Sequence, residues 1–539
     1  MNNLTYSQYI AESFKKFWDI PSMTDYPIRS FNYSDVAYGI RQLWFAFDCL
    51  NIKKGDKVAI CGMNSINWGI TYLATTTYGT VAVPILHEFT TDKITHLIEH
   101  SDSKVLFISE AIWDEMQNSL ECFGKLSAVY SLDDFSLLFS GENKLPYVIG
   151  SMKLEGCTAE EFCDKIHHYS PDELISINYT SGTMSSPKGV MIPSRALSSN
   201  LAFALEVVHM LKTGDNVVSL LPLAHMYGIM YDFLGAIVFG VNVHFMTQPL
   251  TVKNMLSTFK KTKPCIVIVV PLLIETLIRD NIFKYIHKTY FKPFYRLFKP
   301  LADKLIGRVI KTALGGNFYE IIIGGAELDA EVERALIDYH IPFTVGYGMT
   351  ECSPIITYSD QNEHIFRSCG KTAPRMQIEV RDGNQIYVMG DNVMLGYYGN
   401  EQATDEVFDN GWMRTGDVGY FDEDGNLFLE GRSDLIIKND GKNINPKEIE
   451  EIINSSGIIS ESIVYLDKNE NRLKAIVYPS AKRFKTLEDL SEMSRLIDDE
   501  RKKINGKLPV NEQISSFIIY GKPFSKTLKG EIKRYLYVK

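Results

Sequence analysis

The sequence lacks the marks of a secreted, membrane-spanning or nucleic-acid-binding protein. Its longest apolar runs, Phe233–Phe245 and Ile266–Ile278, are short and interrupted by polar residues, glycine or proline, so neither predicts a transmembrane helix. The first residues, Met1–Tyr9, show no charged segment followed by an apolar one, as a signal peptide would. The net charge of −10 leaves no general basic excess for binding nucleic acid. These absences favour a cytoplasmic location.

Paired cysteines, repeats and low-complexity tracts are also missing. The eight cysteines include no Cys-x-x-Cys pair and have no histidine cluster nearby, which argues against a zinc site or a disulfide frame and favours reduced thiols. What is present is ordinary for a globular enzyme, with 45% hydrophobic and 23% charged residues. A chain of 539 residues is too long for one core, so we expect several lobes.

Strand and helix patterns alternate through the first part of the chain. Residues Leu4–Asn51 read as mostly helical, and Asn67–Tyr78 as a further helix, because apolar residues recur at helical spacing. The apolar runs Lys57–Cys61 and Val105–Ser109 predict buried strands. This alternation indicates an α/β fold with mostly parallel sheets covered by helices.

The pattern of apolar and polar residues changes from about Cys369. Short alternating strands appear there, separated by turns at Asp382-Gly, Asp409-Asn-Gly and Asp424-Gly, which predicts antiparallel β structure. From Lys447 the chain reads as a small, lysine-rich lobe of helices and strands.

The stretch Tyr179–Met191 is the strongest candidate for a phosphate-binding loop. It follows the apolar strand Leu174–Asn178 and precedes the expected start of a helix at Pro193. Glycines and small hydroxyls form concave nests for phosphate oxygens, and Lys188 adds a positive charge. The loop is not a Walker A loop, because a glycine follows the lysine; the alternative is a flexible surface loop. Its small residues are Thr180, Ser181, Gly182, Thr183, Ser185, Ser186 and Gly189.

Three further predicted strands run into loops that carry a histidine, glycines or a hydroxyl beside a carboxylate. One strand runs into a loop that carries His225, which on its own is more typical of a structural histidine. The next ends in Gly324 and Gly325, where a flat ring could approach the backbone. The third runs into Thr350 and Glu351, whose oxygens suit a magnesium ion beside phosphates. The last two strand ends and the candidate phosphate-binding loop together predict a nucleotide site.

The order and spacing of these motifs resemble the adenylate-forming superfamily of acyl-CoA synthetases, luciferases and peptide-synthetase adenylation domains. The resemblance covers roughly residues 30 to 535, and five separate motifs agree in order, which a lone glycine-rich match would not do. The five motifs are Tyr179–Gly189, Gly324–Glu327, Tyr347–Glu351, Arg414–Asp417 and Gly431–Lys438.

The resemblance implies a two-domain enzyme that uses ATP, Mg²⁺ and coenzyme A. Residues 1–431 would form a large multi-lobed domain with the acyl and ATP sites, including a β-rich subdomain at about 369–431. Residues 432–539 would form a small, mobile α+β domain that swivels between two half-reactions. In the first, a carboxylate joins the α-phosphate of ATP and releases pyrophosphate; in the second, a thiol displaces AMP.

The resemblance also implies roles for individual residues. Thr350 would touch the α-phosphate, Glu351 would bind magnesium together with Thr183, and Tyr347 would stack on the adenine. A carboxylate suits a vicinal diol, so Asp417 would accept the ribose hydroxyls. The other implied binding residues are Thr180, Ser181, Gly182, Ser185 and Lys188 for the phosphates, Gly325, Ala326 and Glu327 beside the adenine, Arg432 near the ribose, Asp434 at the hinge, and Lys438 and Gly441 for the second half-reaction.

Within the superfamily, Leu221–Gly228 and the insertion at 283–305 look like those of long-chain fatty acyl-CoA ligases. By that likeness His225 lies near the acyl carboxylate. The aromatic and basic insertion Phe283–Leu305 has two interpretations: a pair of surface helices, or a patch for peripheral contact with the inner face of a membrane. The first is favoured because Pro293 breaks any long amphipathic helix.

The sequence departs from the family pattern near its C-terminus. The family frame Lys-Thr-x-x-Gly-Lys-Ile-x-Arg carries a catalytic lysine, but Glu531 stands at that position here. A carboxylate would repel a polyphosphate, so we favour the nearby Lys529 as the replacement. Two other functions stay open: an acyl-AMP ligase that loads a carrier protein, and a weakly active ATP-binding relic.

Overall fold

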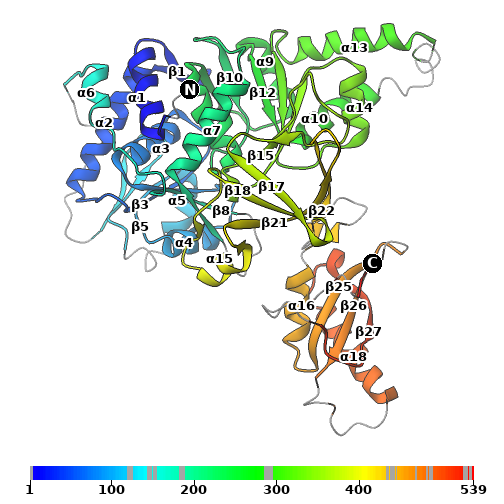
Figure 1. Cartoon of the computed structure of the whole chain (residues 1–539). Coiled ribbons are helices and arrows are strands. Elements are labelled where there is room, and N and C mark those ends of the chain that lie inside the picture. The colour runs from blue at the N-terminus through cyan, green and yellow to red at the C-terminus, as the bar shows by residue number, and fades with distance from the viewer. Residues whose placement is uncertain are drawn as a thin grey trace. The chain divides into compact units, whose positions relative to one another are not determined.

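A computed structural model describes residues 4–117, 125–141, 149, 155–180, 188–284, 295, 297–432, 436–437, 443–444, 446–467, 470–480, 484, 490–525, 532, 534 and 537–538. The chain divides into two compact units (Figure 1). The first unit comprises Met1–Ile378, Val388–Met413 and Phe421–Phe428, and the second comprises Glu379–Tyr387, Arg414–Tyr420 and Leu429–Lys539.

The first unit contains an eight-stranded sheet that includes β8 and β9, the strands before and after the predicted phosphate loop. Strands β8, β4, β3, β5 and β6 run parallel to their neighbours, and β9, β19 and β7 are antiparallel additions at the edges. In sheet order the strands are β19 (Gly396–Tyr397), β9 (Gly189–Pro193), β8 (Leu174–Tyr179), β4 (Val81–Ile85), β3 (Lys57–Cys61), β5 (Ser103–Ile108), β6 (Ala128–Ser131) and β7 (Leu137–Ser140).

A second sheet of nine strands has six parallel strands at its centre, from β14 to β1. These two sheets confirm the predicted α/β class with mostly parallel sheets. In order the strands are β16 (Lys371–Thr372), β15 (Ile355–Tyr358), β14 (Phe343–Gly348), β13 (Glu320–Ile323), β12 (Ile266–Val269), β10 (Asn216–Ser219), β11 (Asn242–Met246), β1 (Pro21–Tyr26) and β2 (Arg29–Asn32).

Helices connect the parallel strands of both sheets. Local sequence fixes their starts: Thr5 and Gln8 form a capping box at the first helix, and the side chain of Ser65 caps the third. No helix in the described part of the chain is both long and apolar enough to cross a membrane. The α-helices of this unit are α1 (Tyr6–Phe17), α2 (Tyr33–Cys49), α3 (Ile66–Tyr78), α4 (Thr91–His100), α5 (Glu110–Met116), α6 (Ala159–Cys163), α7 (Ser194–Val207), α8 (Gly235–Phe239), α9 (Val252–Thr262), α10 (Pro271–Ile278), α13 (Lys299–Ala313), α14 (Ala330–Asp338) and α15 (Glu401–Val407).

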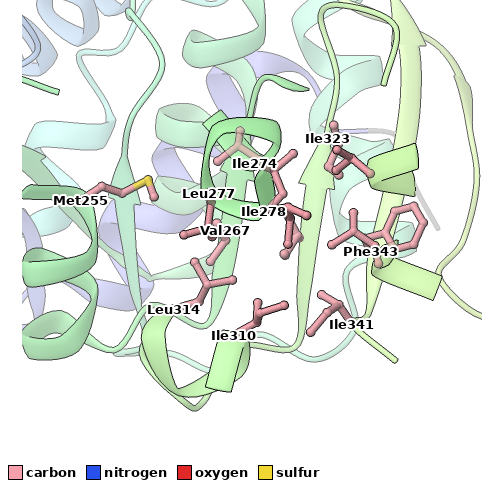
Figure 2. Packing of buried hydrophobic residues seen from close by; sticks show 14 of the residues in the cluster. Met255, Val267, Ile274, Leu277, Ile278, Ile310, Leu314, Ile323, Ile341 and Phe343 are labelled. Carbon is pink, nitrogen blue, oxygen red and sulfur yellow. The ribbon is translucent and has the colours of Figure 1, made fainter. Parts of the chain in front are cut away.

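A large apolar core lies against the second sheet (Figure 2). Val267, Ile323 and Phe343 project from β12, β13 and β14 toward side chains of the surrounding helices. Among these, Ile274 comes from α10 and Ile310 from α13, and both are at most 3% exposed. This packing fixes the strands whose carboxyl ends carry the predicted site.

Short strands follow Lys371, as the sequence predicts. They form a five-stranded sheet in the order β17 (Met376–Arg381), β18 (Gln385–Gly390), β21 (Trp412–Phe421) and β20 (Phe408–Asp409), with β22 (Leu427–Arg432) paired to β21. The second unit holds a three-stranded sheet of β25 (Ile459–Asp467), β26 (Arg472–Pro479) and β27 (Ile514–Ile519), with α16 (Pro446–Asn454) and α18 (Leu490–Asn505). Its own buried core includes Ile453, Leu473 and Ile497, which confirms the expected small α+β domain.

One local prediction was wrong, and one was incomplete. Residues 4–51 are mostly helical, as predicted, but the hairpin β1–β2, which the sequence did not predict, separates α1 from α2. The predicted phosphate loop does not run directly from a strand to a helix: β9 intervenes, pairs antiparallel with β8, and only then does α7 begin at Ser194. Much of the insertion Phe283–Leu305 lies outside the described residues, but α13 is described.

Candidate active site

Two described residues, Thr180 and Lys188, lie on either side of the central part of the predicted phosphate loop. The backbone N–H of Thr180 donates to the carbonyl oxygen of Lys188 at 3.3 Å, so the ends of the loop lie together. The residues between them lie outside the described residues; they include Ser181, Gly182, Thr183 and Ser185.

A cavity of about 310 Å³ opens at the carboxyl ends of β10, β13 and β14 in the first unit. His225, Gly325, Tyr347 and Thr350, four of the residues predicted from sequence, line it together. One wall is apolar and comes mainly from α7 and the segments after β10 and β12. That wall includes Phe203, Ala204, Val207, Val208, Met226 and Val270.

Two glycines are required where the strands end in this cavity. Gly325 has φ +88°, a conformation in which any other residue would be strained. A Cβ on Gly348 would lie 2.0 Å from the carbonyl oxygen of Pro354, so a side chain would displace the backbone after β14. At both positions the lining of the cavity therefore consists of backbone without a side chain.

Burial favours the neutral form of the His225 imidazole. Burial lowers its pKa, and the negative charge of Glu88 opposes that shift only in part. A neutral ring can donate a hydrogen bond from one nitrogen and accept one at the other. His225 can therefore contact a carboxylate without forming a permanent ion pair.

Asp232 supports the His225 loop from beneath, a role that the sequence analysis missed. It lies in the π-helix Gly228–Leu234, fully buried, and one carboxyl oxygen accepts the backbone N–H groups of Leu220 and Leu221 at 2.9 Å each. Burial raises the pKa of Asp232 to about 7 against the effect of these hydrogen bonds. The available signal was one carboxylate within an apolar run.

Tyr397, also missed, connects two predicted site residues. Its hydroxyl donates to Glu351 Oε1 at 2.9 Å, and the Lys188 Nζ lies 4.8 Å from the centre of its ring. Strand pairing creates this contact, because β19 pairs with β9 directly after the phosphate loop. Tyr397 and Glu351 are both less than one-tenth exposed. The structure therefore brings Lys188 and Glu351 to one place.

The Glu351 carboxylate fits a magnesium ion that is held mainly by phosphate oxygens. Among the described residues, Tyr397 is the one that donates to its Oε1, and no described residue donates to its Oε2. Carboxylate oxygens are hard ligands of the kind magnesium prefers, and one or two carboxylates plus substrate phosphates are its usual set.

The segment predicted to border an adenine is only partly in the cavity. Gly325 lines it, whereas Ala326 and Glu327 are exposed and are not among its lining residues. Glu327 pairs with Arg367, which also binds the buried Glu333. The role of Ala326 and Glu327 beside an adenine stays a prediction.

The remaining predicted residues belong to the second unit. Asp417 lies on β21, 8% exposed, and its backbone N–H donates to the Thr415 hydroxyl at 3.1 Å. Arg432 ends β22. Their roles toward a ribose stay predictions. Asp434, Lys438, Gly441, Lys529 and Glu531 lie outside the described residues.

Comparison with known proteins gives two family matches. Residues 10–398 match the model of the AMP-binding enzyme family, and residues 433–539 match the model of the AMP-binding enzyme C-terminal domain. Among curated relatives, the long-chain-fatty-acid–CoA ligase FadD15 of Mycobacterium bovis is 27% identical over 80% of this chain and 75% of its own length. Long chain acyl-CoA synthetase 3 of Arabidopsis thaliana is 26% identical over 83% of this chain and 73% of its own length.

Solved structures share the fold at lower identity. A fatty acyl CoA synthetase of Mycobacterium tuberculosis has a TM-score of 0.65 at 19% identity, covering 99% of this chain and 97% of that one. The O-succinylbenzoate coenzyme A synthetase (MenE) of Bacillus subtilis, in complex with AMP, has a TM-score of 0.64 at 19% identity, covering 98% of both chains. Because the first family model spans more than half of its length, the chain belongs to the AMP-binding enzyme family, within the adenylate-forming superfamily.

Proposed function

We propose that this protein joins a fatty acid to the thiol of coenzyme A, using ATP and releasing AMP and pyrophosphate. The observation that carries the proposal is the single cavity in which His225, Tyr347 and Thr350 meet an apolar wall. The polar groups suit a nucleotide and a carboxylate, and the wall suits a hydrocarbon chain. The names of the relatives support the same reaction class.

In the first half-reaction the fatty carboxylate attacks the α-phosphorus of ATP. A bond forms between a carboxylate oxygen and that phosphorus, the bond to the bridging oxygen breaks, and pyrophosphate leaves with the electron pair. Neutral His225 orients the carboxylate, and the Thr350 hydroxyl donates to an α-phosphate oxygen. The Lys188 ammonium offsets negative charge on the outer phosphates. A bound magnesium ion, held by Glu351, would stabilise charge on the phosphates.

In the second half-reaction the sulfur of coenzyme A attacks the acyl carbonyl of the adenylate. The C–S bond forms, the thiol gives up its proton to solvent, the C–O bond to the phosphate breaks with its electron pair on the phosphate oxygen, and AMP leaves. We assign this step to a second arrangement of the two domains, with Lys438 and Gly441 taking part and Asp434 as the hinge residue, between residues 1–431 and 432–539.

We also propose that the enzyme takes fatty acid from an anionic membrane surface, to which α13 binds peripherally. One face of this helix is apolar at intervals of four residues: Leu301, Leu305 and Val309 are 58, 49 and 61% exposed. Between residues 297 and 312 the single carboxylate, Asp303, is buried and paired with Lys299 at 2.8 Å, whereas Lys304 and Arg308 are exposed. Such a face fits anionic headgroups above an apolar interior.

The test is a panel of straight-chain fatty acids incubated with ATP, magnesium and coenzyme A. We expect pyrophosphate and acyl-CoA to form, with palmitate among the substrates. Replacing coenzyme A by a carrier protein bearing phosphopantetheine separates this function from an acyl-AMP ligase. Binding of ATP with no exchange of labelled pyrophosphate into ATP for any fatty acid would instead identify the weakly active relic suggested by Glu531.

A further inference from the structure

Arg367 has a backbone conformation that is unusual for a residue with a long side chain. Its φ is +69°, in the left-handed region that favours glycine. The backbone N–H of Ser368 donates to the carbonyl oxygen of Ile365 at 2.9 Å, which closes a turn with Arg367 at its third position. Glycine is the usual residue at a turn position with positive φ. The contacts of the arginine side chain must therefore offset the cost of this conformation.

The guanidinium of Arg367 holds the segment Gly324–Leu328, which follows β13. Its Nη1 group donates to the carbonyl oxygen of Leu328, and its Nη2 group pairs with the carboxylate of Glu327. The first two residues of the segment, both glycines, line the active-site cavity. One side chain thus fixes both the backbone and a charged side chain of the segment where it leaves the cavity.

Arg367 is itself anchored to α14 by a buried carboxylate. Its backbone N–H donates to Glu333 Oε1 at 2.7 Å, and the same oxygen accepts from His364 Nε2 at 2.9 Å. The side chains of Glu333 and His364 are 3 and 5% exposed. The ring of His364 packs edge-on against Phe343 of β14, at 4.6 Å between centroids. Because buried hydrogen-bonded groups of this kind are rigid, Arg367 holds the segment Gly324–Leu328 against the core of the first unit.

We propose that Arg367 is a positioning residue for the base of the nucleotide, because it holds the segment Gly324–Leu328 in the path that borders a purine ring. This inference rests on the proposed function, since it concerns the ATP of the same reaction. Without the guanidinium, the segment loses its support and the site loses affinity for the base. Polar groups that are held in place also discriminate between bases, because adenine and guanine present different donors and acceptors at their edges.

The test measures binding of magnesium–ATP and magnesium–GTP to full-length variants by isothermal titration calorimetry. For Arg367→Gly, which suits the positive φ, we expect the Kd for ATP to rise about tenfold, because hydrogen bonds from a charged group are lost. The ratio of the Kd for GTP to the Kd for ATP should fall. Arg367→Lys keeps the positive charge and should recover part of the affinity for ATP.

Arg334 of α14 supplies a matched control. It is exposed, and its guanidinium lies 4.0 Å from the centre of the Phe366 ring, in the same turn as Arg367. Arg334→Gln therefore removes a positive charge beside this turn and leaves the contacts of Arg367 in place. It should keep the wild-type Kd for both nucleotides.

The possible results separate this inference from the proposed function. If the wild-type protein binds ATP but releases no pyrophosphate with any fatty acid, the proposed function fails and the binding measurements still decide the inference; if it binds no ATP, both fail. The inference alone is overturned if the wild-type protein does not prefer ATP to GTP, or if Arg367→Gly lowers the melting temperature but keeps the ratio of the two Kd values. If Arg367→Gly does not fold, Arg367→Gln decides: a fall in this ratio supports the inference, and the wild-type ratio overturns it.

Discussion

At the scale of single residues, Tyr397 is positioned to orient a metal ligand. Its hydroxyl donates to the Glu351 carboxylate and its ring lies under the Lys188 ammonium. We predict that Tyr397→Phe raises the KM for magnesium–ATP about tenfold, because a hydrogen bond to a charged group is lost while the ring is kept. Steady-state kinetics at varied magnesium–ATP concentration measure this.

The neighbouring Tyr398 offers a matched control for that prediction. Its ring contacts His100 and Lys57, and its backbone N–H pairs with Gly189. Tyr398→Phe should therefore leave the KM for magnesium–ATP unchanged. If Tyr397→Phe lowers the melting temperature but leaves the KM for magnesium–ATP and the KM for fatty acid at their wild-type values, the role of Tyr397 is purely structural.

Asp232 gives a prediction about pH and stability. Because burial raises the pKa of its carboxyl from 3.8 to about 7, the folded protein holds a proton between these values that the unfolded chain has lost. Its contribution to the free energy of unfolding should therefore fall as pH rises through this window, by about 1.4 kcal/mol for each pH unit. Asp232→Asn cannot ionise and keeps an oxygen for the two N–H groups. Denaturant unfolding at pH 5 and pH 8 should show wild type losing stability relative to Asp232→Asn; equal losses would contradict a raised pKa.

Sequence reasoning found the residues that end strands and missed those that support them. Gly325, Tyr347 and Thr350 follow directly on apolar strands, so local patterns were enough to bring them to one cavity. Tyr397 reaches Glu351 only because β19 pairs with β9, an association between segments about two hundred residues apart. The spacing of apolar residues within one segment cannot predict a pairing between segments so far apart in the sequence.

At the scale of elements, α13 has two apolar faces, one buried and one exposed. Ile310 faces the core, whereas Leu301, Leu305 and Val309 are exposed beside Lys304 and Arg308. We predict that the double variant Leu301→Asp/Leu305→Asp lowers binding to vesicles of anionic lipid at least tenfold, because two charges would have to enter the apolar layer. Vesicle co-sedimentation at low and high salt measures this.

A control variant for α13 lies elsewhere on the surface. Val510 is 86% exposed, and Val510→Asp introduces the same charge outside this helix. It should leave vesicle binding unchanged. If the α13 double variant and Val510→Asp bind vesicles equally well, α13 is an ordinary surface helix.

The errors at this scale have a common cause. The hairpin β1–β2 was missed because each strand is short, and β1 is buried between β11 and β2 without the alternation of an edge strand. Likewise β9, which the sequence analysis missed, has only five residues and directly precedes α7, the helix that was predicted. Long periodic segments such as α3, and apolar strands such as β3 and β5, were predicted to within a few residues.

At the scale of the whole molecule, the chain keeps two compact units with separate cores. Arg534 is the last residue of the C-terminal motif that contains Glu531, and it is anchored within the second unit. Its guanidinium pairs with the buried Glu450 of α16 and donates to the carbonyl oxygen of Val464 at 3.4 Å. In the family frame, Glu531 stands three residues before Arg534, at the position of the usual lysine.

The replacement of that lysine makes the first half-reaction the sensitive one. We predict that Glu531→Lys increases exchange of labelled pyrophosphate into ATP at least tenfold, because a cation replaces a carboxylate where charge grows on the α-phosphate. Transfer from chemically made acyl-AMP to coenzyme A should change little, because it follows adenylation. Lys529→Ala completes the test: if it abolishes exchange in the wild-type background while Glu531→Lys changes nothing, Lys529 already serves the reaction, and the glutamate is a tolerated neighbour.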